Sequence, residues 1–178
     1  MTTRQEPQWV LRAQVGDRDA IETLLRSVQP SLTRYVRALV GAADTEDVAQ
    51  DVMVVIYRKL WMLSTPDLFR PWMYRIASRS AFRHLQMRRS WPDHLRDDEA
   101  LAELPAHDLA VLSTRVDELL QDPRVTPASR AVLALHFQEE MTLPEVAGIL
   151  DIPLGTVKSR LAYGLATLRR RYAGETND

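Results

Sequence analysis

The chain of 178 residues contains no cysteine, few glycines and no long apolar run. Without cysteine it can form neither a disulfide framework nor a thiolate zinc site, which fits a reducing cytoplasm. The N-terminal segment is polar and no apolar stretch reaches membrane-spanning length, so we expect no secretory signal, no membrane insertion and a cytoplasmic location. Only 6 glycines stand against abundant leucine, alanine and arginine, a composition that favours helices over strands.

Sequence patterns typical of catalysis are also missing. The 4 histidines are scattered without a shared spacing, and there is no glycine-rich phosphate loop and no serine motif in a strand-to-helix context. The acidic triplet at residues 97–99 has no second carboxylate or histidine cluster at helical spacing, so we interpret it as solvated chain rather than a metal site. We therefore predict a binding function, with no enzyme activity, no catalytic residues, no metal and no cofactor.

The distribution of apolar residues indicates how the chain is organised. The apolar fraction of 46% is enough for a helical core, and the length suits one domain or two small ones. Residues 92–108 are rich in proline and acidic residues and interrupt the helical pattern. We predict an all-α fold, with two small helical domains at residues 1–91 and 109–178 joined by a flexible acidic linker at 92–108.

The formal net charge of -1 hides a segregation of charge along the chain. Residues 69–91 carry arginines and no acidic residue, and residues 153–172 are also free of acidic residues. Acidic residues concentrate between these blocks, at 92–122. Two basic blocks around an acidic connector indicate two phosphate-facing surfaces, each able to bind nucleic acid although the whole-chain charge would not predict it.

The first domain is expected to begin with three helices. They are predicted at residues 4–15, 18–41 and 46–63. Asp17 is a good N-cap for the second helix, and Pro30 is expected to kink or split it. Asp44 or Thr45 should cap the third. Besides its core face, the third helix carries a partly acidic surface made of Asp47, Gln50, Asp51 and Val54.

A fourth helix is expected from residue 71 to about residue 89, with two different faces. One ridge, at steps of four, is apolar: Met73, Ala77, Ala81 and Leu85. The nearly opposite ridge is basic: Arg75, Arg79 and Arg83. Aromatic residues are interleaved with these arginines, and exposed aromatic rings can stack on unpaired bases. They are Trp72, Tyr74, Phe82 and His84. The alternative is a solvated arginine face over aromatic residues that belong to the core.

The second domain should end in two short helices joined by a tight turn. A helix is expected at residues 109–120, and Thr126 should cap another that has Pro127 at its first position. Residues 141–164 then divide into a short amphipathic helix, a break rich in turn-forming residues, and a second helix.

This final pair has an apolar inner side and a basic, hydroxylated outer side. The inner face of its first helix is Leu143, Val146, Ala147 and Leu150. That of the second is Val157, Leu161, Leu165 and Leu168. The outer side carries Thr156, Lys158, Ser159, Arg160 and Tyr163. The arrangement is typical of a DNA-binding helix-turn-helix, with an ordinary helical hairpin as the alternative.

Three stretches together resemble the extracytoplasmic-function (ECF) sigma factors of bacteria, group IV of the sigma-70 superfamily. Residues 44–57, DTEDVAQDVMVVIY, look like that family's acidic helix for binding core RNA polymerase. Residues 69–89, FRPWMYRIASRSAFRHLQMRR, look like its promoter-melting helix, which reads the minus-10 element. Residues 143–161, LPEVAGILDIPLGTVKSRL, look like its minus-35-reading helix-turn-helix. Their order and spacing extend the resemblance over nearly the whole chain.

The resemblance implies core RNA polymerase and promoter DNA as partners, and assigns residues to each. Minus-35 contacts would fall to Gly155, Thr156, Lys158, Ser159, Arg160 and Tyr163. Minus-10 contacts would fall to Trp72, Arg75, Arg79, Ser80, Arg83, Arg88 and Arg89. Core polymerase would meet Asp47, Gln50, Asp51 and Val54. The loop at residues 64–70 would lie where the family captures a flipped base. Relatives are commonly held inactive by an anti-sigma factor, although no residue here identifies one.

The chain departs from the family pattern at three positions. Relatives often have Asn and Asp where Arg79 and Arg83 stand, so stronger phosphate contact is expected here. Tyr163 replaces a basic residue that relatives often carry, so a different minus-35 preference is expected. The alternatives are a stand-alone helix-turn-helix regulator that acts without polymerase, and a helical interaction protein whose basic faces only solvate it. The acidic surface around Asp47 favours the sigma factor, because a simple repressor has no need of it.

Overall fold

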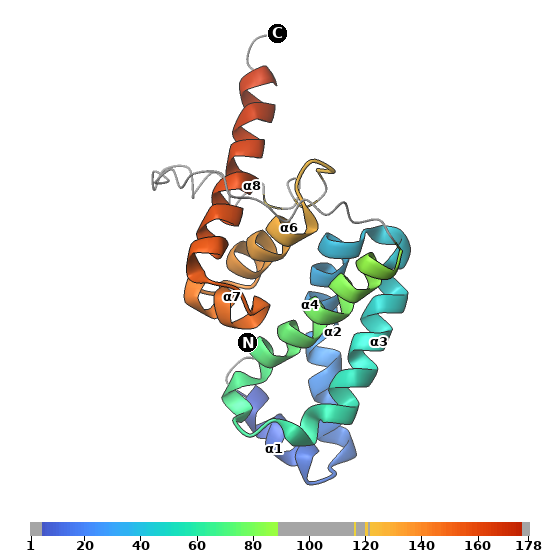
Figure 1. Cartoon of the computed structure of the whole chain (residues 1–178). Helices are drawn as coiled ribbons and strands as arrows, with labels where there is room; N and C mark the ends of the chain where they lie inside the picture. The colour runs from blue at the N-terminus through green and yellow to red at the C-terminus, as the bar shows by residue number, and fades with distance from the viewer. Residues whose placement is uncertain (1–4, 89–115, 117–119, 121, 176–178) are drawn as a thin grey trace. The chain divides into compact units, whose positions relative to one another are not determined.

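The computed structural model describes residues 5–88, 116, 120 and 122–175, with the side chains of the last helix given up to Thr167. Every regular element in this part of the chain is helical, which confirms the predicted all-α class (Figure 1). The chain divides into two compact units, Met1–Arg88 and Arg89–Asp178. The predicted linker at 92–108 and most of the predicted helix at 109–120 lie outside the described residues, so their limits stay predictions.

The described part of unit 1 consists of α-helices joined by short 3-10 turns. The helices are α1 Glu6–Gln14, α2 Arg18–Val40, α3 Thr45–Lys59 and α4 Phe69–Met87. The turns are η1 Ala42–Asp44, η2 Leu60–Met62 and η3 Pro66–Leu68. The four predicted helices are therefore present. The one difference in extent lies at the end of α3, where the last residues of the predicted helix form the tighter turn η2.

The predicted cap of α2 is confirmed, whereas that of α3 is wrong in its chemistry. The Asp17 side chain accepts a hydrogen bond from the amide of Ala20 at 3.1 Å. Together with the Arg12 guanidinium, this bond holds the pKa of Asp17 below its ordinary value. Asp44 occupies the N-cap position of α3 but its side chain caps nothing, because it is turned to partners on α4. The Thr45 hydroxyl instead donates back to the carbonyl oxygen of Gly41 at 2.7 Å.

Pro30 does not split α2, so one of the two outcomes predicted for it is wrong, and the kink stays a prediction. It lies on the exposed side of the helix and removes a single backbone donor. The opposite side of α2 is fully buried before and after it, at Leu24, Val28 and Leu32. Because both halves pack on the same core, their burial outweighs the loss of one hydrogen bond, and the helix continues through the proline.

The centre of unit 1 is a polar contact inside an apolar core. The rings of Tyr35 on α2 and Tyr74 on α4 meet edge to face, with centroids 5.1 Å apart. The Tyr35 hydroxyl lies 2.7 Å from the hydroxyl of Ser78, which donates to the carbonyl oxygen of Tyr74. Both tyrosines are fully buried, so this bond gives a buried hydroxyl a polar partner. It fixes α4 against α2 and thereby sets which side of α4 faces outward.

Unit 2 contains α6 Pro127–Leu133, the π-helical turn η4 Ala134–Gln138, α7 Leu143–Leu150 and α8 Leu154–Glu175. Thr126 caps α6 as predicted, accepting from the Ser129 amide at 3.2 Å. The cap of α7 is a capping box that the sequence analysis missed, in which Thr142 and Glu145 exchange hydrogen bonds. The Thr142 hydroxyl and then the Thr142 amide, which both donate to the Glu145 carboxylate, hold the pKa of Glu145 below its ordinary value.

Helices α7 and α8 form the predicted helix-turn-helix, but α7 packs with a slightly different face (Figure 1). Its buried residues are Val146 and Ile149, whereas Ala147 and Leu150, expected inward, are half-buried. Of the ridge predicted for α8, Val157, Leu161 and Leu165 are buried, whereas the side chain of Leu168 lies outside the described part. Asp151 adopts the left-handed conformation, with φ 58°, which ends α7 and turns the chain toward α8.

Candidate nucleic-acid interface

Helix α4 has the two faces that its sequence pattern predicts. Its inward ridge is buried: Met73, Ala77, Ala81 and Leu85. Its outward ridge is exposed: Arg75, Arg79 and Arg83. Successive members of the outward ridge are four residues apart, about 6 Å along the helix, so their positive charges form a row parallel to its axis. Ser80 lies half-buried beside them. The arrangement can bind a strand that runs along α4.

The aromatic residues of α4 divide between the core and the surface. Tyr74 belongs to the core, so it is not available to a base. Trp72 and Phe82 are half-buried, and the Trp72 ring lies against that of Phe69 at a centroid distance of 6.1 Å. For Tyr74 the structure therefore supports the core alternative, whereas Trp72 and Phe82 keep part of their surface open to solvent.

Arg70 and Arg88, in the basic block at 69–91, form ion pairs that the sequence did not reveal. Arg70 forms a bidentate ion pair with the buried Glu6 of α1, with N–O distances of 2.6 and 2.9 Å. Arg88 pairs with Asp44, and His84 Nε2 lies 3.3 Å from the same carboxylate. Arg89 lies outside the described residues.

The environment of Asp44 explains its ionisation. Partial burial raises the pKa of this carboxyl, but the hydrogen bonds and charges of His84 and Arg88 outweigh that effect and leave the pKa below its ordinary value. Asp44 is therefore held as a carboxylate that ties the start of α3 to the end of α4. Arg88, which was expected to contact DNA, has this structural contact as well.

The partly acidic surface of α3 is exposed as predicted. Asp47, Gln50 and Asp51 are open to solvent, and Val54 is 42% exposed. These residues follow the i, i+3, i+4, i+7 spacing of one helix face. The face therefore offers two carboxylates, one side-chain amide and one apolar side chain to solvent.

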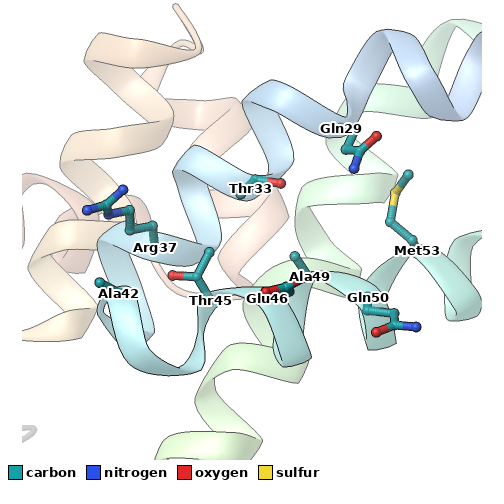
Figure 2. Close-up of a pocket in the computed structure, with 9 residues that line it drawn as sticks. All are labelled: Gln29, Thr33, Arg37, Ala42, Thr45, Glu46, Ala49, Gln50 and Met53. Atoms are coloured by element: carbon teal, nitrogen blue, oxygen red, sulfur yellow. The ribbon is translucent and has the colours of Figure 1, made fainter.

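Two grooves border this surface, and both extend it beyond the predicted residues. The larger, of about 740 Å³, runs between α2 and α3, where Gln29, Thr33 and Arg37 face Glu46 and Gln50 (Figure 2). The contribution of α2 was missed, since these polar residues carry no motif.

The smaller groove, of about 270 Å³, lies between α3 and α4. It brings Asp51 and Val54 next to Ser80 and Arg83. The residues predicted for polymerase and those predicted for the minus-10 strand therefore share one border on unit 1.

In the helix-turn-helix, the predicted minus-35 residues lie on the first turns of α8 and differ in their exposure to solvent. Gly155 and Lys158 are exposed, and Thr156 and Arg160 are half-buried. The Ser159 hydroxyl donates to the carbonyl oxygen of Thr156 at 3.0 Å, within the helix.

Tyr163 has an intramolecular contact that the sequence did not predict. Its hydroxyl donates to the carbonyl oxygen of Arg124, before α6, at 3.3 Å. Tyr163 thereby links α8 to the segment that precedes α6, which points to a structural role alongside the predicted one.

The predicted loop at residues 64–70 comprises the connection between η2 and α4 and the first two residues of α4, and most of it is exposed. Ser64, Thr65, Asp67 and Leu68 are open to solvent. The loop is anchored by buried side chains at both ends, Leu63 before it and Phe69 near its end. A loop that is exposed between rigid anchors can present its side chains to a ligand in a defined position.

Among the described residues, no three His, Asp or Glu side chains are grouped closely enough to hold a metal ion. The acidic triplet at 97–99 lies outside that part of the chain. In the same described part, no helix combines the length and the hydropathy needed to span a membrane.

Comparison with known proteins agrees with the division of the chain into two units. Residues 24–91 match the family model "Sigma-70 region 2", and residues 123–170 match "Sigma-70, region 4". The RNA polymerase sigma-H factor of Pseudomonas aeruginosa is 28% identical over 174 residues, covering 90% of this chain and 90% of that protein. The ECF sigma factor SigW of Bacillus subtilis is 25% identical, covering 88% and 90%. The ECF sigma-E factor of Escherichia coli K12 is 27% identical, covering 85% and 86%.

A solved structure has the same fold. The structure of CnrH in complex with the cytosolic domain of CnrY matches with a TM-score of 0.64 and 23% identity, covering 93% of this chain and 97% of that chain. The two region models match the two units in the order expected of a sigma factor, and the curated relatives match over almost their full length. The chain therefore belongs to the sigma-70 family, as an extracytoplasmic-function sigma factor.

Proposed function

We propose that this sigma factor divides promoter-specific initiation among three surfaces of its two units. The arginine ridge of α4 contacts the non-template strand at the minus-10 element, the outer side of α8 binds the minus-35 duplex, and the α3 surface docks on core RNA polymerase. The observation that carries the proposal is the pair of basic faces, one in each unit, each backed by a buried apolar ridge on the same helix.

The two DNA-facing surfaces perform different tasks. On α8, Lys158 and Arg160 are close enough to the start of the helix to enter a major groove, where arginine and lysine bind guanine edges. On α4, Arg75 and Arg79 supply positive charge to a separated strand while Trp72 offers an aromatic surface. Capture of unpaired bases offsets the cost of unstacking, a few kcal/mol per base, so opening needs no hydrolysis by this chain.

Docking on polymerase is assigned to the exposed acidic surface of α3 together with the groove between α2 and α3. Asp47, Gln50, Asp51 and Val54 supply negative charge and one apolar contact. Because polymerase and chromosomal DNA share the cytoplasm, the protein is expected to work there.

A regulatory partner is also expected. CnrH has been solved with the cytosolic domain of CnrY bound to it. A protein that covers the α3 surface would prevent docking on polymerase, which is how we propose an anti-sigma factor would act on this chain.

Reconstituted transcription tests the function. Purified core RNA polymerase is incubated with genomic DNA fragments, with and without this chain, and transcript starts are mapped. We expect initiation at a small set of promoters that share two elements, only when the chain is present. Binding of duplex DNA without association to polymerase would instead favour a stand-alone helix-turn-helix regulator.

The docking surface is tested by the Asp47→Ala/Asp51→Ala variant. It should lose affinity for core polymerase and keep the isolated minus-35 binding. Glu22→Ala is the matched control, because Glu22 is an exposed acid on α2 that forms an ion pair with Arg26, one turn away on the same helix. Equal loss of polymerase binding in both would contradict the assignment of the α3 surface.

A further inference from the structure

The loop at residues 64–70 is held at both ends by one helix, α1. Just before the loop, the side-chain amide of Gln14 donates to the carbonyl oxygen of Leu63 at 2.7 Å and to that of Leu60 at 2.9 Å. At its far end, Arg70 is bound to the Glu6 carboxylate through two nitrogens. The residues between these anchors, except the half-buried Pro66 and the buried Phe69, are exposed. Figure 1 shows α1 beside this connection.

Gln14 uses both N–H donors of its side-chain amide in this contact. A glutamine amide has two N–H donors, and here both are directed to backbone carbonyl oxygens. The acceptors belong to the turn η2 and to the residue that ends it, and the Leu60 carbonyl oxygen also accepts from the Leu63 amide at 3.1 Å. Gln14 therefore fixes the backbone position from which the loop departs.

The contact at Glu6 is stronger and less open to water. Glu6 is only 3% exposed, and a bidentate carboxylate–guanidinium pair has a defined relative orientation. Loss of either partner would leave the other charge poorly solvated. Glu6 therefore fixes the start of α4 as well as the end of the loop.

These two contacts lie eight residues apart on a rigid helix, about 12 Å along its axis. Between them, Val10 and Ala13 bury the inner face of α1 in the core of unit 1. The two ends of the loop are thus set by one element rather than by the loop's own residues, most of which are exposed.

We infer that Gln14 and Glu6 are positioning residues for recognition of an unpaired minus-10 base by the loop at 64–70. The inference rests on the capture of a flipped base, which the resemblance to ECF sigma factors implies for that loop. Neither residue touches DNA in this scheme; each sets the distance and orientation of the loop relative to the arginine ridge of α4. Recognition of a base depends on such positioning, because polar contacts weaken steeply when the geometry is lost.

The test uses the full chain with core polymerase on a promoter identified by the transcription experiment. Each minus-10 base is replaced in turn, and open complexes are measured by permanganate reactivity. The readout is the ratio of open complex on the original element to that on the substituted one. A variant that merely lowers the folded fraction changes both quantities equally, so the ratio does not respond to stability.

Gln14→Met is the main variant, since it keeps the length of the side chain and removes both donors. At the base that the loop reads, we expect the ratio to fall about three- to tenfold, the size of one or two lost neutral hydrogen bonds. Glu6→Gln should lower it as well. Gln8→Met is the matched control, because Gln8 lies on the exposed side of the same helix, and its ratio should stay at the wild-type value. Hydrogen exchange of the amides at residues 64–68 should be faster in Gln14→Met and unchanged in Gln8→Met.

A direct loop variant, Ser64→Ala/Thr65→Ala/Asp67→Ala, separates base recognition by the loop from the positioning of the loop by Gln14 and Glu6. If it loses discrimination while Gln14→Met and Glu6→Gln keep the wild-type ratio, the positioning role is overturned and the role of the loop stands. If the loop variant itself keeps full discrimination at every minus-10 base, base recognition by the loop is wrong, and the positioning role falls with it.

Discussion

At the scale of single residues, the contacts that a side chain makes in the folded protein decide its role, which the sequence pattern alone does not. Arg70, Arg75, Arg79, Arg83 and Arg88 belong to one basic block of the sequence. In the folded protein, Arg70 is paired with a buried carboxylate and Arg88 with Asp44, whereas the other three form the exposed ridge of α4. Identical residue types in one block therefore have different tasks.

The salt dependence of DNA binding should distinguish these arginines. Each phosphate contact that is lost lowers the slope of log K against log salt by about 1. We expect this change for Arg75→Ala and Arg79→Ala, together with impaired promoter opening. Arg88→Ala should change the slope less, because its guanidinium is already bound to Asp44. Filter binding of forked promoter DNA by the holoenzyme at several salt concentrations measures the slopes, with the exposed Arg18→Ala as control.

Arg160 and Tyr163 should respond differently to substitution although both lie on the predicted outer side of α8. Arg160→Ala should weaken minus-35 binding by about 1–3 kcal/mol, the worth of a good base contact. Tyr163→Phe removes the hydrogen bond to Arg124 and should lower the free energy of unfolding by about 1 kcal/mol. It should leave the preference among minus-35 sequences unchanged.

Duplex binding and thermal unfolding of both variants provide the measurements. Equal binding of matched and scrambled elements by wild type and Arg160→Ala would contradict the role of Arg160. A changed minus-35 preference in Tyr163→Phe would show that the hydroxyl contacts DNA.

At the scale of elements, the orientation of α8 depends on a close approach to α6. A Cβ atom built on Gly164 would lie 2.7 Å from Leu133 Cδ1, and Leu133 is fully buried. Because a helical glycine otherwise costs stability, its presence at this position follows from packing rather than from helix propensity.

Gly164→Ala should therefore destabilise unit 2. Overpacking of a buried contact costs about 1–3 kcal/mol, which exceeds the gain of up to about 1 kcal/mol in helix propensity. Gly148→Ala on α7 is the matched control, because a Cβ there would meet nothing within 4 Å. It should raise the free energy of unfolding by up to about 1 kcal/mol. Urea unfolding of the two variants measures both free energies of unfolding. A stabilised Gly164→Ala would mean that Leu133 moves aside without cost.

At the scale of the whole molecule, stability depends on carboxylates that are held ionised in both units. The pKa values of Asp17 and Asp44 in unit 1, and of Glu145 in unit 2, lie below their ordinary values. A carboxyl whose pKa is lowered by folding contributes stability above its unfolded pKa, and the contribution disappears as the pH falls through the folded pKa. Acid should therefore weaken both units, each through its own contacts.

Asp44→Asn tests this linkage. At neutral pH the variant should unfold at a lower temperature than wild type, because His84 and Arg88 lose their carboxylate partner. As the pH falls below the ordinary range of aspartic acid, the difference should close, since wild-type Asp44 becomes protonated as well. Thermal unfolding followed by circular dichroism between pH 7 and pH 3 measures it, and a difference that is constant with pH would contradict the prediction.

Sequence alone was sufficient wherever a feature depends on near neighbours in the chain. The caps at Asp17 and Thr126, the two faces of α4 and the helix-turn-helix follow from helical spacing, because backbone geometry places residues three or four apart on one face. Sequence was insufficient where packing or a distant partner outweighed a local preference: α2 is not split at Pro30, and the Asp44 side chain binds His84 and Arg88 instead of capping α3.

Only the tertiary structure decided which side chains meet across the fold. Glu6 and Arg70 are 64 positions apart, Gln14 and Leu63 are 49 apart, and Tyr163 and Arg124 are 39 apart. Such pairs arise when burial of apolar faces fixes one helix against another, so residue spacing in the sequence does not predict them. The helical surfaces were therefore predictable, whereas the bracing of the loop by α1 became visible only in the folded protein.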